Sequence, residues 1–184
     1  CKGNLPERMD EALDALADPP GLILDFRANG GGGFDHEALM GRFVPPGETL
    51  RFVKTYRIAG PRPYTGNIVV IVDALTRSAG ETASGMFKED GRAYMIGESA
   101  TAGMSSSKKT LRLPSGLFEL YVSVASNMGR FNQGRGIEGI GVVHHEIVAY
   151  DAEDLAAERD TLIQRAEAIL ADFPVKKVPY RSPD

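Results

Sequence analysis

The sequence predicts a single α/β domain over residues 1–173, followed by a short C-terminal tail, 174–184. Two short apolar runs, 21–26 and 67–72, are bounded by turn residues and are typical of buried strands. Segments with helical spacing alternate with such strands along the chain, which is the pattern of an α/β fold. With 184 residues, 42% of them hydrophobic, the chain is large enough to bury one substantial core.

The first predicted helix, Leu5–Ala17, carries Pro6 at a position where the missing N–H leaves no helical hydrogen bond unmade. A Pro-Pro-Gly turn ends this helix, and the first apolar strand then runs into four consecutive glycines, 30–33. A second, short helix is predicted over 35–43. Apolar and polar residues alternate over 48–59, which predicts another strand.

The second apolar strand is followed by small and polar residues at helical spacing. A helix is therefore expected from Ser78 to about Gly91, and serine is a favoured residue at the N-cap of a helix. A strand over 92–96 comes next, and a loop rich in glycine and serine, 97–107, follows it.

The C-terminal third of the chain contains a predicted hairpin, a loop and a last helix. A Pro-Ser-Gly turn joins the two strands of the hairpin, a glycine-rich loop precedes a further strand, and Pro174 closes the helix. The elements predicted here are strands over 109–113, 117–124 and 142–148 and a helix over 154–173.

The composition excludes several classes of function. A net charge of −4 and a pI near 5.5 provide no basic footprint for nucleic acid. The single cysteine, Cys1, rules out an intrachain disulfide, and with only three histidines no metal and no cofactor is expected. No segment approaches the ~20 apolar residues that cross a membrane. Cys1 is either a lipidation site or the first residue of a piece of a longer chain.

The stretch LDFRANGGGG, residues 24–33, follows the first apolar strand. Successive glycines permit positive φ angles and close backbone approach, and their N–H groups can form a concavity that binds an anion. No lysine follows the glycines, so the stretch is not a nucleotide phosphate loop. Asp25, Arg27 and Asn29 alternate just before the glycines, and we expect them to form a scaffold that holds this loop.

Ser78 stands where the second apolar strand gives way to a helix. Serine is a common N-cap, and the same position suits a nucleophile, because the partial positive charge at a helix N-terminus favours an alkoxide or a nearby oxyanion. The two roles are therefore compatible. The N–H of Ala79 would then serve as an oxyanion donor. The sequence TRSAG lacks a glycine two residues before the serine, so the Gly-x-Ser-x-Gly elbow does not fit.

Two further glycine-rich stretches complete the pattern, GESATAG at 97–103 and IEGIGVVHHEIV at 137–148. With LDFRANGGG and TRSAGE they follow the order LDLRxNxGG, TASAxE, GExTxG, xxGxGVxPDxxV of the C-terminal processing, or tail-specific, serine protease family. The chain resembles this family over about residues 22–169. It resembles the tricorn-core branch more closely, because no lysine follows GESATAG.

The resemblance implies a serine peptidase on an α/β core of the crotonase/ClpP-like kind. Ser78 corresponds to the family's nucleophile. The N–H of Ala79 and a backbone N–H of the glycine loop, at Gly31 or Gly32, correspond to its oxyanion hole. In the tricorn-like branch a catalytic glutamate lies near the IExxGV stretch, so the resemblance makes Glu138 the candidate here.

The resemblance does not identify the general base. Met104 stands where the C-terminal processing branch has its lysine, and a thioether cannot take up the proton. Lys108 and Lys109 follow shortly after it. His36 and the pair His144-His145 are of the right chemical type for a base near neutral pH. In the tricorn-like branch the histidine comes from a strand upstream of the LDLR motif.

Two other functions are compatible with this fold. A catalytically inactive relative would bind a peptide or another ligand without cleaving it, and Met104 is the residue that favours this alternative. An acyl-thioester enzyme has a similar oxyanion hole, but Ser78 within TRSAGE follows the protease pattern, and no basic patch for a nucleotide phosphate is evident.

The expected partner of the peptidase is a peptide or an unfolded protein. A homo-oligomer and an upstream PDZ-like or helical segment of the same protein are further candidates that the resemblance implies. The sequence leaves the location unknown. Peptidases of the C-terminal processing type often work outside the cytoplasm, which favours export or membrane association, whereas tricorn-like peptidases work inside it.

Overall fold

The computed structural model of the chain describes residues 4–45 and 57–173. Helices and strands alternate through most of it, as the sequence predicts. In chain order the elements are α1 (Leu5–Leu16), β1 (Gly21–Asp25), α2 (His36–Gly41), β2 (Asn67–Val72), α3 (Ala79–Glu89), β3 (Tyr94–Gly97), β4 (Lys108–Arg112), β5 (Glu119–Ser123), β6 (Glu146–Ile147), α4 (Ala152–Ala156) and α5 (Thr161–Ala171).

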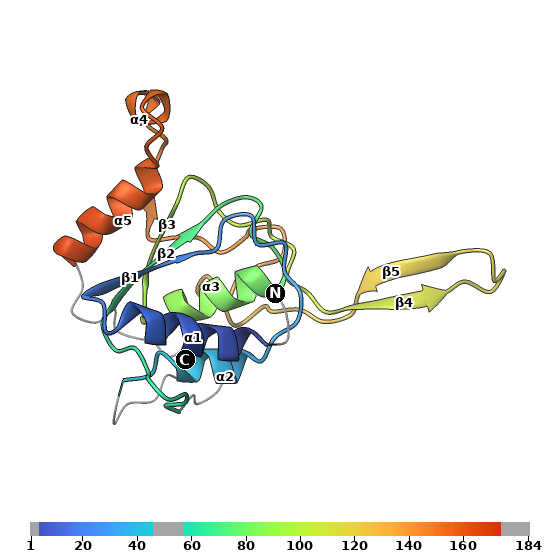
Figure 1. The fold of residues 1–184 in the computed structure, drawn as a ribbon. Helices are drawn as coiled ribbons and strands as arrows, with labels where there is room; N and C mark the ends of the chain where they lie inside the picture. Colours follow the sequence, from blue (N-terminus) through green and yellow to red (C-terminus); the bar gives the residue numbers. More distant parts are fainter. Residues whose placement is uncertain (1–3, 46–56, 174–184) are drawn as a thin grey trace.

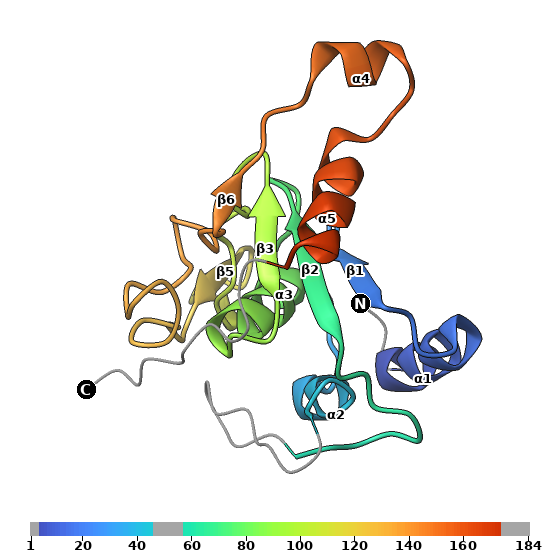
Figure 2. The same cartoon turned by 90° about the vertical axis from the view of Figure 1, so that its left-hand side faces the viewer.

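A parallel sheet in the order β1-β2-β3-β6 forms the centre of the fold. Helices α1, α2 and α3 cover one face and α5 covers the other (Figures 1 and 2). Strand β2 is buried on both sides, which explains its continuous apolar sequence. Its residues Ile68, Val70 and Val72 face the core of α1–α3, whereas Val69 and Ile71 face α5. The predicted α/β class is confirmed.

The hairpin of β4 and β5 projects from the body of the molecule (Figure 1). Helix α4 also extends from the body, away from the hairpin.

Most of the predicted elements lie close to their expected bounds. The strand predicted over 48–59 falls largely outside the described residues, and 57–59 form no strand. The predicted tail, 174–184, also lies outside the described residues.

No helix in the described ranges has the length and apolar character needed to cross a membrane.

The prediction of one helix over 154–173 is wrong, because two helices, α4 and α5, occupy this segment. The chain breaks between them at Glu158, whose φ is 55°. Asp160 then caps α5, since its carboxylate accepts hydrogen bonds from Leu162 N (3.0 Å) and Ile163 N (3.1 Å). The same carboxylate pairs with Arg27 at 2.7 Å, so a tertiary ion pair helps to fix where α5 begins.

The strand predicted over 142–148 is shorter than expected, because β6 contains only Glu146 and Ile147. His145 accounts for part of this difference. Its Nδ1 accepts a hydrogen bond from Met95 N at 2.9 Å, in the place where a strand carbonyl would otherwise lie. The imidazole ring stacks on Tyr94, with 4.9 Å between ring centroids. A side chain therefore replaces the first rung of the β3–β6 ladder.

Acidification is expected to destabilise the fold through His145. Burial against Tyr94 lowers the pKa of His145 to about 4, and protonation would also break its bond with Met95 N–H. In the unfolded chain the pKa returns to about 6.5. The unfolded state therefore binds more protons between pH 6.5 and 4, and stability that is present above pH 6.5 is lost as the pH falls.

We expect His145 to contribute about 1 kcal/mol to this loss, after allowance for solvent screening of its exposed side. Urea unfolding of the wild-type and His145→Gln proteins at pH 7.5 and 4.5 measures it, and the variant should lose less stability on acidification. An imidazole of His145 that titrates near pH 6.5 by NMR would contradict the prediction.

Candidate active site

Ser78 occupies the turn between β2 and α3, and its backbone is strained. Its φ of 55° and ψ of −122° lie outside the regions that a residue with a Cβ normally adopts. Such conformations cost about 1–3 kcal/mol and cluster at functional sites. Ser78 is an exposed residue at the N-terminus of α3. A strained turn from strand to helix is how α/β-hydrolases expose their nucleophile.

The buried carboxylate of Glu81 holds this turn. Glu81 is 0% exposed, and its Oε2 accepts hydrogen bonds from Ser78 N and Met104 N, both at 2.9 Å. Its Oε1 accepts from Thr101 Oγ1 and Gly103 N, both at 2.7 Å. Four donors thus surround one buried carboxylate, which satisfies its charge and joins the Ser78 turn to the 101–104 loop.

Thr101 continues this network to the last glycine-rich stretch. Its hydroxyl donates to Glu81 and accepts from Val142 N at 2.7 Å. Gly141, at φ 78°, packs its backbone against that of Thr101 so closely that a Cβ would collide with the Thr101 carbonyl. The segments TRSAGE, GESATAG and IEGIGV, which are far apart in the sequence, therefore meet around Glu81 and Thr101.

The glycine loop lies directly against Ser78. Gly31 has a φ of 92°, and a Cβ placed there would lie 2.6 Å from Ser78 Cβ and 3.2 Å from Ser78 Oγ. Arg77 N donates to Asn29 O at 3.0 Å, which ties the loop to the turn. Only glycine leaves room for both backbones at this point.

Two polar side chains position the glycine loop. Asn29 Oδ1 accepts from Gly31 N at 3.1 Å, and Asn29 packs against Gly80 at the start of α3. Asp73, at the end of β2, accepts from Ala28 N at 3.0 Å and from Thr76 N at 2.8 Å. Asn29 therefore acts in the scaffold that the sequence predicts, whereas Asp25 and Arg27 pair with each other at 2.6 Å.

Three backbone groups are candidates for the oxyanion hole. Ala79 N is the first N–H of α3, and in the described part of the chain neither it nor Gly32 N has a hydrogen-bond acceptor. Gly31 N points instead to Asn29 Oδ1. The structure thus places Gly31 and Ala79 next to Ser78, and the roles of Ala79, Gly31 and Gly32 as donors remain predictions.

Glu138 lies in an exposed turn beside the site. The next residue, Gly139, donates its N–H to Gly103 O at 2.8 Å, so this turn contacts the loop that Glu81 holds. Within the described ranges the Glu138 carboxylate makes no hydrogen bond or ion pair. The structure brings Glu138 to the same group of loops as Ser78, and its catalytic role remains a prediction.

Met104 adjoins Ser78 through its backbone. Its carbonyl accepts from Ser78 N at 3.2 Å, and the residue is 50% exposed. Lys108 is engaged elsewhere, since its Nζ donates to Ser106 Oγ (2.9 Å) and Ser123 Oγ (3.0 Å) at the base of the hairpin. Lys109 is exposed. Position 104, which the resemblance aligns with the family's lysine, therefore lies next to Ser78. The methionine at this position cannot act as a base.

The three histidines make no hydrogen bond to Ser78 in the part of the chain that the structure describes. Burial lowers the pKa of His36, which packs edge-on against Phe34 with ring centroids 4.2 Å apart. Burial also lowers the pKa of His144, which lies against Gly97. The side chain of His145 is engaged between β3 and β6, where its Nδ1 accepts a hydrogen bond from Met95 N. Nor do the described residues contain a group of three His, Cys, Asp or Glu side chains placed to hold a metal ion.

Sequence reasoning missed the residues that hold the site together, which are Glu81, Thr101, Asp73, Asn127 and Asn132. Asn127 and Asn132 hold the last glycine-rich stretch: Asn127 Oδ1 accepts a hydrogen bond from Ile137 N, and Asn132 Oδ1 accepts one from Val143 N. One signal was available, because Ser78-Ala79-Gly80-Glu81 reads as a Ser-x-x-Glu capping box. The contacts of the asparagines join residues in loops without a local pattern, so no comparable signal existed for them.

Replacement of Glu81 by glutamine is expected to lower the free energy of unfolding by about 2–4 kcal/mol. The amide NH2 would face N–H donors that now meet a carboxylate oxygen, and a buried donor would lose its partner. Urea unfolding at pH 7.5 measures the change. Glu138→Gln, which alters an exposed carboxylate, is the control, and equal effects of the two substitutions would contradict the prediction.

Comparisons with known proteins show the family and the fold of the chain. The model of peptidase family S41 matches residues 2–148. The photosystem II D1 C-terminal processing protease is 25% identical, with a TM-score of 0.58 over 92% of this chain and 44% of its own. No curated protein sequence matches.

Two further solved structures share the fold. Mature CPAF has a TM-score of 0.73 at 14% identity, over 94% of this chain and 48% of its own. The tricorn protease has a TM-score of 0.60 at 20% identity, over 85% of this chain and 15% of its own. The chain thus spans less than half the length of each of these three structures.

The fold likeness agrees with the crotonase/ClpP-like α/β core that the motifs imply. The family match covers the glycine loop, the Ser78 turn and the loops that Glu81 and Thr101 bring together. The chain therefore belongs to peptidase family S41, a family of serine peptidases.

Proposed function

We propose that this chain forms the catalytic part of a serine endopeptidase in which Ser78 is the nucleophile. The observation that carries the proposal is the strained backbone of Ser78 at the exposed N-terminus of α3, with Gly31 packed against its side chain. Strain of this kind is retained where a side chain must be presented in one orientation. The proposed substrate is a peptide or an unfolded stretch of protein.

In the proposed reaction Ser78 Oγ attacks the carbonyl carbon of a peptide bond and loses its proton to a base. The N–H of Ala79, with an N–H of Gly31 or Gly32, stabilises the negative oxygen that develops. The C–N bond then breaks, the leaving amine takes up a proton, and an acyl-enzyme remains. Water hydrolyses the acyl-enzyme, and Glu138 is the proposed carboxylate that orients the base.

A second candidate function is peptide binding without cleavage. Met104 favours it, because a methionine next to Ser78 supplies no base. Peptide binding by the complete protein, with no turnover and no reaction of Ser78, would support this function over the first.

A fluorophosphonate probe should label the complete protein at Ser78, because the probe reacts with serine hydroxyls activated beside an oxyanion hole. Mass spectrometry of the labelled peptide identifies the residue. Ser78→Ala should abolish labelling, and Ser84→Ala, which changes a buried serine of the same helix, should not. Labelling that survives Ser78→Ala would exclude this nucleophile.

Gly31→Ala is expected to reduce labelling at Ser78 by at least about tenfold, because the new methyl group would lie 2.6 Å from Ser78 Cβ and displace it. Gly33→Ala is the matched control, since a Cβ there meets nothing within 4 Å. The rate of labelling measures both. Equal rates for the two variants would show that the Gly31 contact does not position Ser78.

A further inference from the structure

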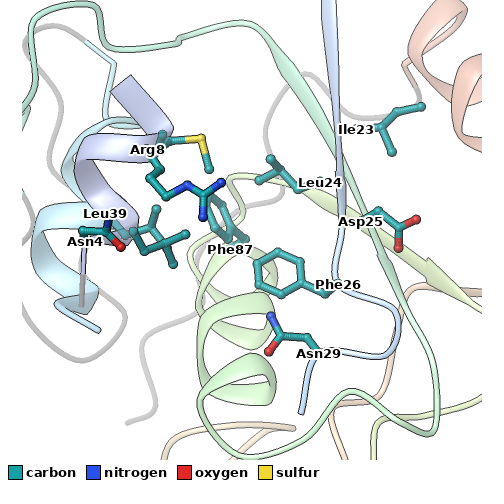
Figure 3. Close-up of a pocket in the computed structure, with 11 residues that line it drawn as sticks. Asn4, Arg8, Ile23, Leu24, Asp25, Phe26, Asn29, Leu39 and Phe87 are labelled. Atoms are coloured by element: carbon teal, nitrogen blue, oxygen red, sulfur yellow. The ribbon is translucent and has the colours of Figure 1, made fainter. Parts of the chain in front are cut away.

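A cavity of about 430 Å³ lies between α1, β1 and α3. We call it the Arg8 pocket, and its lining includes Arg8, Leu24, Phe26, Asn29, Leu39 and Phe87 (Figure 3). Most of the residues that line the pocket are apolar, so it suits a ligand with an apolar body.

One end of the Arg8 pocket adjoins the candidate active site. Asn29 lines the pocket, and its side chain also holds Gly31 N and packs against Gly80. Gly31 in turn lies against Ser78. A peptide whose carbonyl reached Ser78 would therefore place neighbouring residues at the entrance to this pocket.

The guanidinium group of Arg8 places a positive charge in the wall of the pocket. Figure 3 shows the guanidinium of Arg8 extending from α1 toward Leu24 and Phe87. Within the described ranges, helix α1 forms two ion pairs, and both use its aspartates: Asp10 pairs with Arg42 at 2.6 Å, and Asp14 pairs with Arg62 at 3.2 Å. Arg8 takes part in no ion pair within these ranges. The Arg8 charge is therefore available to a ligand.

The second charged residue of the lining does not cancel Arg8. Asp25 points to the opposite side of β1 from Leu24 and Phe26 (Figure 3). Its carboxylate is bound there by Arg27, with an Nη2–Oδ2 distance of 2.6 Å. The pocket is thus apolar with a net positive charge, which favours a carboxylate on an apolar stem.

The edge of β1 that faces away from β2, which has no neighbouring strand among the described residues, borders the same pocket. Among the described strands β1 is terminal and pairs only with β2. Phe26 N donates to Ile71 O at 2.8 Å, and alternate residues of a parallel strand face the same neighbour. Ile23 and Asp25, which line the pocket, therefore turn their backbone N–H and C=O groups to the open edge. An extended peptide can add to such an edge through main-chain hydrogen bonds.

We propose that the Arg8 pocket is a substrate subsite that selects a glutamate side chain close to the scissile bond. The substrate backbone lies along β1, the stem of the glutamate packs between Leu24 and Phe87, and its carboxylate pairs with Arg8. This inference rests on the proposed peptidase function, because it is that function which places a peptide at Ser78.

Fluorescence anisotropy with the Ser78→Ala protein tests the subsite without cleavage. The probes are short alanine- and leucine-based peptides with amidated C-termini, in which glutamate occupies each position in turn and glutamine replaces it in the partner peptide. At one position glutamate should bind about fivefold to tenfold more tightly than glutamine. Arg8→Gln should remove this preference, and Arg8→Glu should transfer it to the corresponding lysine peptide.

Arg112→Gln, which removes a positive charge from the remote hairpin, is the control and should keep the glutamate preference. Equal binding of all glutamate and glutamine pairs, no binding at all, or a preference that survives Arg8→Gln would overturn the inference. Dependence on Arg8 that appears only for peptides with a free C-terminus would assign the pocket to a terminal carboxylate instead, and would also overturn it.

Labelling of Ser78 separates this inference from the proposed function. A protein that reacts with the fluorophosphonate at Ser78 but shows no Arg8-dependent preference is a peptidase with another subsite. A protein that prefers glutamate through Arg8 but whose Ser78 does not react is a peptide-binding relative, and in that case the pocket selects a ligand rather than a substrate.

Discussion

The carboxylate of Glu81 is the interaction on which the candidate site depends. A fully buried carboxylate requires hydrogen-bond donors, and here they come from Ser78, Thr101, Gly103 and Met104. The parallel sheet makes this possible, because the loops that follow β2 and β3 leave the same edge of the sheet. One charge on α3 thereby fixes the position of the helix N-terminus relative to the loop after β3.

The strained backbone of Ser78 is held by contacts on several sides. Its N–H is shared between Glu81 Oε2 and Met104 O, and its carbonyl accepts from Ser105 Oγ at 3.1 Å. The glycine loop closes the remaining side, with Gly31 in contact with the serine side chain. The contacts that stabilise this part of the fold are thus the same ones that fix the orientation of the Ser78 backbone.

The methionine at the family's lysine position leaves this scaffold unchanged, because position 104 contributes only its N–H and C=O. Its exposed side chain takes no part in the network. The chemistry of proton transfer and the geometry of the site are therefore separable in this protein. The same scaffold is compatible with a peptidase whose base is a group other than residue 104. It is equally compatible with a site that binds peptides without cleaving them.

Sequence by itself determined most of the local elements and the family, since buried strands need apolar runs, positive φ angles favour glycine, and four motifs in order identify the family. Tertiary structure decided the rest. A side chain of His145 shortened β6, and Asp160, held by Arg27, started α5 later than helical periodicity predicts. The role of Glu81 beyond its own capping box was likewise undecidable from sequence, because its partners Thr101, Gly103 and Met104 are about twenty residues away and meet it only when β2 and β3 pair.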